Sequence, residues 1–241
     1  MCGRYTSTHQ DALVADLELA LASDQACVGV LAVAPGLPAG LTSWWAPRWN
    51  IAPTQPAPVV VMRDTIATLA LMRWGLVPQW ADGLAIGVRM INARAETAAS
   101  KPSFRDALRR RRCLVAADGF YEWQRDGKRR LPFRFAPADD AAVTFAGIWD
   151  RWRPRDHGPD APWVESFSIL TTVADPLVAP LHDRMPVVIA AADRGRWLSR
   201  EDLPPVAIAE LLAPAPLTGW ERRAAEPWVN AASRERAAPA G

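Results

Sequence analysis

The amino-acid sequence predicts an α+β fold, a single β-rich domain whose mixed or antiparallel, barrel-like core carries peripheral helices. Three observations lead to this prediction. Half of the 241 residues are hydrophobic and 22% are charged, so the chain can bury a substantial core. Strand-like runs recur along most of the chain, whereas helical periodicity is confined to a few short segments. No linker interrupts this pattern, and we expect one domain over residues 1–230 and a frayed tail over 231–241.

The first elements predicted are a short strand and a helix. Gly3–Thr6 predicts the strand, and Asp11–Ala22 predicts the helix because leucines recur at the four-residue step of one helix face. These leucines are Leu13, Leu17 and Leu21. Residues Ser23–Pro47 are rich in Gly, Pro and Ala without a clear period, so we expect an inserted loop there.

Strand patterns account for most of the remaining chain. Val59–Met62 and Thr65–Trp74 predict a hairpin that turns at Arg63 and Asp64, and the pair Asp126-Gly127 predicts a second hairpin. The other runs predicted as strands are Cys113–Ala117, Gly119–Gln124, Leu131–Phe135, Val143–Trp149, Ser166–Val173 and Met185–Ile189.

A helix is predicted at Phe104–Arg112, where Ser103 can cap the N-terminus. Four arginines, Arg109–Arg112, crowd its last turn. The helix dipole favours cations at this end, which is one explanation for them, and a surface that faces phosphates is the other. Two further helices are expected near the C-terminus, at Ala192–Ser199 and Val206–Leu212.

Composition excludes several classes of protein. The longest apolar stretches fall well short of the ~20 residues that span a membrane, and the first residues lack the apolar segment of a secretory signal. The three cysteines form no C-x-x-C pair, so neither a disulfide framework nor a zinc site is expected. We therefore expect a cytoplasmic protein with no membrane partner, no metal and no cofactor.

Arginine and tryptophan are over-represented. Only Lys101 and Lys128 are lysines among the 28 basic residues, and 12 Trp stand against 6 Phe and 2 Tyr. A GC-rich genome explains the arginine excess as a whole. Guanidinium groups also hold phosphates, however, and indoles stack on bases. Because the net charge is only +2, a nucleic-acid surface on this chain has to be a local patch.

Cys2 directly follows the initiator methionine, and its small side chain permits methionine removal. The mature chain then begins with a 1,2-aminothiol, whose amine and thiol have reference pKa values of about 7.7–8.0 and 8.5. The amine can condense with an aldehyde, and the thiolate can close onto the same carbon to give a thiazolidine. Gly3 leaves room for a ligand, and Arg4 is expected to lower the pKa of the thiol. The alternative is that a small residue at position 2 serves only methionine removal.

Three further residues are candidates for the same chemistry. Glu122 lies in an aromatic strand, where burial would raise its pKa toward that of a proton donor, although strand alternation also allows it to face solvent. His182 is a candidate general acid or base, or a loop histidine paired with the aspartate after it. Asn92 is a neutral hydrogen-bonding residue that would share one strand face with Arg94, or else it caps a turn.

Six short motifs occur in order along the chain: Met1–Tyr5, Trp49–Pro53, Arg73–Pro78, Ile91–Thr97, Asp118–Trp123 and Leu181–Pro186. Together they closely resemble the SOS-response-associated peptidase (SRAP) family, the abasic-site processing proteins. The resemblance runs from Cys2 to about Asn230 and so covers essentially the whole chain.

The resemblance implies a protein that binds single-stranded DNA containing an abasic site and protects it from strand cleavage by a thiazolidine crosslink through Cys2. It implies that Asn92 hydrogen-bonds at the crosslink, that Glu122 positions the amine and assists opening of the sugar ring, and that His182 supports proton transfer. It also assigns phosphate contacts to Arg4, Arg94 and Arg184, and the shaping and wedging of the DNA to Asn50, Pro53 and Trp80. We expect a monomer that joins the nucleoid when bound to DNA.

Two other functions fit the same residues. A thiol peptidase or amidohydrolase would use Cys2 as its nucleophile and His182 as its base. A non-covalent binder of single-stranded DNA would rely on the arginines and tryptophans, and it would bind intact and abasic DNA equally.

Overall fold

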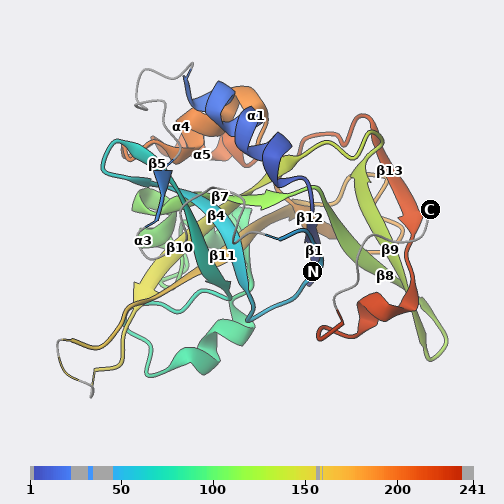
Figure 1. Cartoon of the computed structure of the whole chain (residues 1–241), viewed down its shortest axis with the longest axis horizontal. Coiled ribbons are helices and arrows are strands. Elements are labelled where there is room, and N and C mark those ends of the chain that lie inside the picture. Colours follow the sequence, from blue (N-terminus) through green and yellow to red (C-terminus); the bar gives the residue numbers. More distant parts are fainter. Residues whose placement is uncertain (1–2, 23–31, 35–45, 156–157, 159, 235–241) are drawn as a thin grey trace.

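The structure is a computed structural model that describes residues 3–22, 32–34, 46–155, 158 and 160–234. Strands dominate the described residues, and short helices surround them (Figure 1). The predicted α+β, β-rich fold is therefore confirmed. The predicted Ser23–Pro47 loop lies mostly outside the described residues, as does the end of the predicted C-terminal tail.

Within the described ranges, the larger sheet has eight strands and a mixed direction. They are β2 (Ala32–Val33), β4 (Pro56–Arg63), β5 (Ile66–Trp74), β6 (Asn92–Arg94), β7 (Arg112–Ala117), β10 (Val143–Trp152), β11 (Val164–Val173) and β12 (Arg184–Pro186). Five of them close into a ring, because β11, β10, β7, β4 and β5 pair in that order and β5 pairs again with β11. The closing pairs, Ser166 with Arg73 and Phe167 with Trp74, are parallel, whereas the other pairs around the ring are antiparallel.

The smaller sheet holds the beginning of the chain. In the same part of the chain it comprises five strands, β1 (Tyr5–Ser7), β3 (Arg48–Ile51), β8 (Gly119–Asp126), β9 (Arg129–Pro137) and β13 (Trp220–Ala224). Strand β1 lies between β8 and β3, and Tyr5 pairs with Phe120 on one side and Ile51 on the other. A strand bonded on both sides is fixed in register, so the residues before Tyr5 leave the sheet at a defined place.

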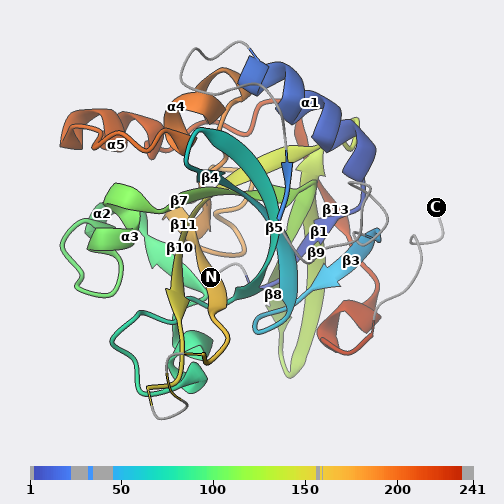
Figure 2. The same ribbon diagram turned by 60° about the vertical axis from the view of Figure 1, so that its left-hand side comes forward.

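The helices are short and peripheral. They are α1 (Gln10–Ala22), α2 (Ala95–Ala98), α3 (Arg105–Arg110), α4 (Arg194–Leu198) and α5 (Pro205–Leu211), with 3₁₀ turns η1 (Leu84–Arg89), η2 (Ala191–Asp193) and η3 (Pro227–Asn230). Helices α1, α4 and α5 lie together over one end of the sheets in both views (Figures 1 and 2). Helix α3 lies apart from them, beside β7 and β10 (Figure 2).

The ring strands bury both of their faces. Val59 and Val61 of β4 belong to the core between the two sheets, together with Tyr5 and Trp74, whose rings meet edge to face at 5.2 Å. Val60, on the opposite face of β4, packs in the second core, under the helices that contribute Leu13, Leu17 and Trp197. Because side chains alternate along a strand, the consecutive valines of β4 pack in two different cores.

Most predicted elements are present with shifted ends. The hairpin of β4 and β5, the helix α1 and the six later strand runs are confirmed. The predicted cap of the middle helix is wrong: α3 begins at Arg105, and its N-cap residue is Phe104, with no side-chain cap. The reason is a preceding turn, in which the N–H groups of Phe104 and Arg105 both donate to the Lys101 carbonyl. None of the helices formed by the described residues is both long and apolar enough to cross a bilayer.

Candidate functional site

A cleft of about 950 Å³ opens beside the residues that precede β1. It is bordered by four parts of the structure: the start of the described chain, the β8–β9 hairpin, the turn before β12, and the end of η3. Its lining residues are Gly3, Arg4, Glu122, Trp123, Gln124, Arg125, Lys128, Arg130, Pro180, Leu181, His182 and Asn230. The structure thus brings three of the predicted site residues, Arg4, Glu122 and His182, into one cleft.

Glu122 is a buried acid. It lies in β8 opposite Phe133 of β9, and only 4% of its surface is exposed. Burial raises its pKa from 4.5 to about 7, because a carboxylate loses much of its hydration there. The solvent-facing alternative for this residue is therefore wrong. At neutral pH a substantial fraction of Glu122 is protonated, and it can donate a proton into the cleft.

His182 is half-buried and is held by its own turn. Its Nδ1 accepts a hydrogen bond from the backbone N–H of Arg184 at 2.9 Å and lies 3.0 Å from Asp183 Oδ1. Because a backbone N–H can only donate, the neutral ring in this hydrogen bond carries its proton on Nε2. Burial lowers the pKa of His182, so the neutral imidazole predominates near pH 7.

Asn92, Arg94 and Arg184 lie on the two strands that flank the end of β11. Asn92 pairs with Ile169 in β6 and is buried, whereas Arg94 is exposed at the end of the same strand. Arg184, in β12, is also buried, and its guanidinium holds both carboxylate oxygens of Glu96 at 2.7–2.8 Å. This bidentate bond lowers the pKa of Glu96. These residues do not line the cleft, but β12 joins directly to the turn that carries His182.

The residues expected to shape the DNA occupy three different environments. Asn50 is fully buried in β3, and its amide donates to the carbonyls of Ala231 and Arg234 at 2.9 Å. Pro53 is half-buried in the turn after β3. Trp80 has half of its surface exposed. None of these three lines the cleft, and their contacts with DNA stay a prediction.

Cys2, the predicted nucleophile, lies outside the described residues. Its neighbour Gly3 is the first described residue and lines the cleft with Glu122 and His182. The carbonyl of Arg4 accepts the N–H of Tyr121, the residue before Glu122. Backbone hydrogen bonding therefore couples the start of the chain to the strand that carries the buried acid.

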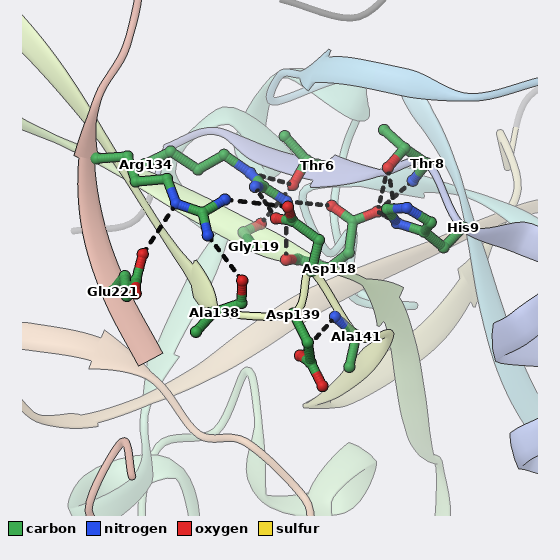
Figure 3. A network of polar contacts seen from close by, with 12 residues as sticks. Thr6, Thr8, His9, Asp118, Gly119, Arg134, Ala138, Asp139, Ala141 and Glu221 are labelled. Carbon is green, nitrogen blue, oxygen red and sulfur yellow. Dashed lines mark hydrogen bonds and ion pairs between the residues drawn. The ribbon is translucent and has the colours of Figure 1, made fainter. Parts of the chain in front are cut away.

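A buried ionic network fixes the other end of β1 (Figure 3). Asp118, with 1% of its side chain exposed, accepts hydrogen bonds from the backbone N–H and the hydroxyl of Thr8, the latter at 2.7 Å. Its other carboxylate oxygen lies 3.0 Å from the guanidinium of Arg134, which also donates to Thr6 at 3.3 Å and to Asp140 at 2.5 Å. The network thereby ties β1 to both strands of the β8–β9 hairpin.

Replacing Asp118 by asparagine is expected to destabilise the protein by about 3–5 kcal/mol, because loss of one member of a buried pair leaves the other charge poorly compensated. Chemical denaturation of parent and variant measures the change. Glu221→Gln is the control, since that carboxylate contacts the outer arginine, Arg223, and is half exposed; its expected cost is about 0–1 kcal/mol. Equal stabilities of Asp118→Asn and the parent would show that the network does not hold β1.

The sequence reasoning missed the cations of the β8–β9 hairpin. Arg125, Lys128 and Arg130 line the cleft beside Glu122, and the Arg130 guanidinium lies 5.3 Å from the Trp123 ring centroid. Trp123 donates in turn to Asn230 at 2.6 Å. The available signal was the basic run around the Asp126-Gly127 turn, which begins three residues after a candidate acid. Together with Arg4, these residues make the cleft strongly positive.

Two cysteines besides Cys2 remain, Cys27 and Cys113. Cys113 is fully buried, and burial raises the pKa of its thiol, which agrees with a structural role; Cys27 lies outside the described residues. In the part of the chain that the structure describes, no three His, Cys, Asp or Glu side chains are grouped so that they could hold a metal ion.

Comparison with known proteins relates this site to a family. The model of the SOS response associated peptidase (SRAP) family matches residues 1–232. The abasic site processing protein YoqW of Bacillus subtilis is 37% identical over 169 residues, which are 70% of this chain and 74% of the relative. The abasic site processing protein YedK of Escherichia coli is 31% identical over 206 residues, 83% of this chain and 81% of that protein.

The fold has solved counterparts. A crystal structure of a protein from Bordetella bronchiseptica superposes with a TM-score of 0.70 at 25% identity, covering 93% of this chain and all of the other. The similarity therefore extends over most of the fold.

Proposed function

Because this chain belongs to the SOS response associated peptidase family, we propose that it binds abasic sites in single-stranded DNA and captures them covalently through Cys2. The observation that carries the proposal is the cleft itself. A buried acid with a pKa of about 7 and a neutral histidine line the same cleft as Gly3, which is bonded to Cys2. An aldehyde that enters this cleft meets an amine, a thiol, a proton donor and a proton acceptor.

The proposed reaction begins after removal of Met1. The α-amine of Cys2 adds to the C1′ aldehyde of the ring-opened sugar, and loss of one water gives an imine. The thiol then adds to the imine carbon, forming a C–S bond while its proton passes to the nitrogen. The product is a thiazolidine, and the adduct contains all atoms of protein and DNA except one water. Closing the ring removes the imine that would otherwise permit strand cleavage by β-elimination.

Each described residue has a role that its environment allows. Glu122, protonated in part at neutral pH, donates to the ring oxygen of the closed sugar and then holds the amine as a carboxylate. His182, neutral and half-buried, takes the thiol proton and returns it to the nitrogen. For Asn92, which is buried on β6 and does not itself line the cleft, we propose a neutral hydrogen bond at the crosslink.

The phosphates are bound by the cations around the cleft. Arg4, Arg125, Lys128 and Arg130 line it, and Arg94 is exposed at the end of β6. Arg184 is held by Glu96, so a phosphate that reaches it has to share or displace this carboxylate. Trp80 offers an exposed indole on which a base can stack. Asn50 and Pro53 shape the surface, Asn50 by holding residues 231–234. Such a protein acts as a monomer in the cytoplasm, on the nucleoid.

Purified protein incubated with a single-stranded oligonucleotide that carries one abasic site is expected to give an adduct that survives denaturing electrophoresis. Its intact mass should equal protein without Met1 plus oligonucleotide minus one water. The same oligonucleotide with an intact base is the control and should give no adduct. Turnover of added peptides without any adduct would instead favour a thiol peptidase, and equal non-covalent binding of both oligonucleotides without any adduct would favour a simple single-strand binder.

A further inference from the structure

A second basic cleft, of about 460 Å³, lies between the β4–β5 hairpin, the end of α3 and the β10 strand. It shares no lining residue with the cleft of Glu122. Its lining includes five arginines: Arg63, Arg110, Arg111, Arg151 and Arg200. Two of them belong to the arginine run at the end of the middle helix, and the proposed crosslinking chemistry uses none of the five.

The run Arg109–Arg112 separates into different roles. Arg112 is buried, and its guanidinium donates to backbone carbonyls, among them those of Trp197 and Leu108, so it is structural. Arg109 is paired with Asp202. Arg110 and Arg111 instead face the second cleft. The helix-dipole and solvated-surface explanation therefore does not cover the whole run.

Two arginines of this cleft are held in place before any ligand arrives. Arg63 donates to both oxygens of Glu165 at 2.7–2.9 Å and lies 5.7 Å from the Trp149 ring centroid. The Nε of Arg111 lies 3.3 Å from Asp150, a buried carboxylate whose side chain is 7% exposed. Guanidinium groups fixed in this way lose little further freedom when they bind an anion.

The second cleft carries uncompensated positive charge. Arg63, Arg111 and Arg200 each have a carboxylate partner, Arg200 pairing at 3.1 Å with Asp64. Arg110 and Arg151 are exposed and have no ion pair among the described residues. Two unpaired guanidinium groups beside three paired ones repel one another, and an anion between them would relieve this repulsion.

Two exposed tryptophans adjoin residues of the second cleft, although neither lines it. Among the described residues, Trp80 and Trp163 are the tryptophans with the largest exposed fractions, 50% and 46%. Trp163 lies next to two guanidinium groups, those of Arg151 at 4.8 Å and Arg153 at 4.6 Å from its ring centroid. Trp80 follows Gln79, which lines the cleft. Arginine and indole thus share one surface, the combination that binds single strands through phosphates and bases.

We propose that this second cleft binds the phosphodiester backbone of the single-stranded DNA that flanks the abasic site, with bases of that segment stacked on Trp80 and Trp163. The inference rests on the proposed function, since it extends the path of the strand held in the first cleft. An acidic peptide could satisfy the arginines, but it offers no base to the exposed indoles. The arrangement therefore favours nucleic acid.

The double variant Arg110→Ala/Arg151→Ala tests this inference, because both side chains are exposed and neither forms an ion pair among the described residues; the contact of Arg151 with the exposed Trp163 ring is lost with it. The substrates are abasic oligonucleotides of about 5 and about 25 nucleotides, the first near the lower end of a typical single-strand site of ~4–16 nucleotides and the second longer than such a site. The adduct rate with the short oligonucleotide should equal that of the parent. Affinity for the long one should fall at least about tenfold, and the slope of log K against log salt should decrease by about 1.4 for two lost phosphate contacts.

The control is Arg196→Ala/Arg222→Ala, which changes the net charge equally at exposed arginines outside both clefts. It should leave long-strand affinity within about twofold of the parent, as expected when no phosphate contact is lost. Unchanged affinity and salt slope in Arg110→Ala/Arg151→Ala would overturn the inference. Competition by polyglutamate as strong as that by DNA would also overturn the inference, because it would show that this surface binds an acidic protein. The affinity for long oligonucleotides without an abasic site is measured separately. Absence of any adduct would contradict the proposed function, whereas this affinity decides whether the second cleft binds single-stranded DNA.

Discussion

A Cys2→Ser variant is expected to form no denaturant-resistant adduct with abasic single-stranded DNA. The serine variant keeps the α-amine and can still form an imine, but a hydroxyl is a poor substitute for a thiolate in closing the ring. Denaturing electrophoresis should therefore lose the stable adduct entirely. Borohydride, which reduces an imine to a stable amine, should restore a crosslinked band for this variant. Electrophoresis with and without borohydride therefore distinguishes imine formation from thiazolidine closure.

Cys113→Ala is the matched control for the loss of a thiol. Cys113 is fully buried in β7, and burial raises the pKa of its thiol, so it has no access to DNA. This variant should form the adduct at the parent rate, after a check that it is folded. A stable adduct formed by Cys2→Ser at the parent level would contradict the proposed chemistry.

Insertion of one alanine between Met1 and Cys2 tests the need for a free aminothiol. The thiol is retained, but the mature chain then begins with alanine and the cysteine amine is an amide. A thiazolidine cannot form, so the stable adduct should disappear. A peptidase that used only the thiol would not need the amine of the same residue, and its activity on peptides should persist. Intact mass confirms which residue begins the chain.

Much of the fold could be predicted because its hydrophobic periodicity is local. The β4–β5 hairpin and α1 both have the spacing of one secondary structure over many residues, and both are present. The short strands β3 and β13 were not predicted. Their formation depends on partners far away in the chain, Tyr5 for β3 and Phe133–Pro137 for β13, and a short segment carries little information about such pairing.

The site was predictable from residue chemistry only in part. Glu122 could be identified as a candidate acid, but its burial depends on the packing of the β8–β9 hairpin against other segments, which no local pattern gives. The sequence also could not show that Arg184 is held by Glu96, 88 residues earlier in the chain. The sequence likewise could not show that the arginines of the run Arg109–Arg112 have different roles, because these roles depend on the Trp197 carbonyl and on the buried carboxylate of Asp150.

Glu122→Gln is expected to slow adduct formation by about 10²–10⁴-fold, the usual contribution of a positioned acid or base. Glutamine keeps the size and the hydrogen-bonding shape of the side chain but has no proton to transfer. The rate of adduct formation by the parent should fall on the alkaline side of about pH 7, where Glu122 loses its proton. In the variant this alkaline decline should be absent, because amide groups do not titrate. Single-turnover rates between pH 5 and 9 measure both effects.

Stability gives an independent measurement of the same group. The folded pKa of Glu122 is raised from 4.5 to about 7, so the folded state binds the proton more tightly than the unfolded state. The corresponding stability is fully present below about pH 4.5 and is lost as the pH rises through 7, in total about 3 kcal/mol. The free energy of unfolding of the parent should therefore fall over this range relative to that of Glu122→Gln. The exposed Glu201→Gln should follow the parent.

These two experiments locate the cause of any failure. If stability shows the pH dependence of Glu122 but Glu122→Gln forms the adduct at the parent rate, the acid is buried as described and takes no part in the chemistry. If neither the stability nor the rate depends on Glu122, the cleft does not bury this carboxylate in solution. Only the combination of a slowed reaction and a flattened stability profile assigns proton donation to Glu122, because a purely structural residue would change stability and leave the pH dependence of the rate unaltered.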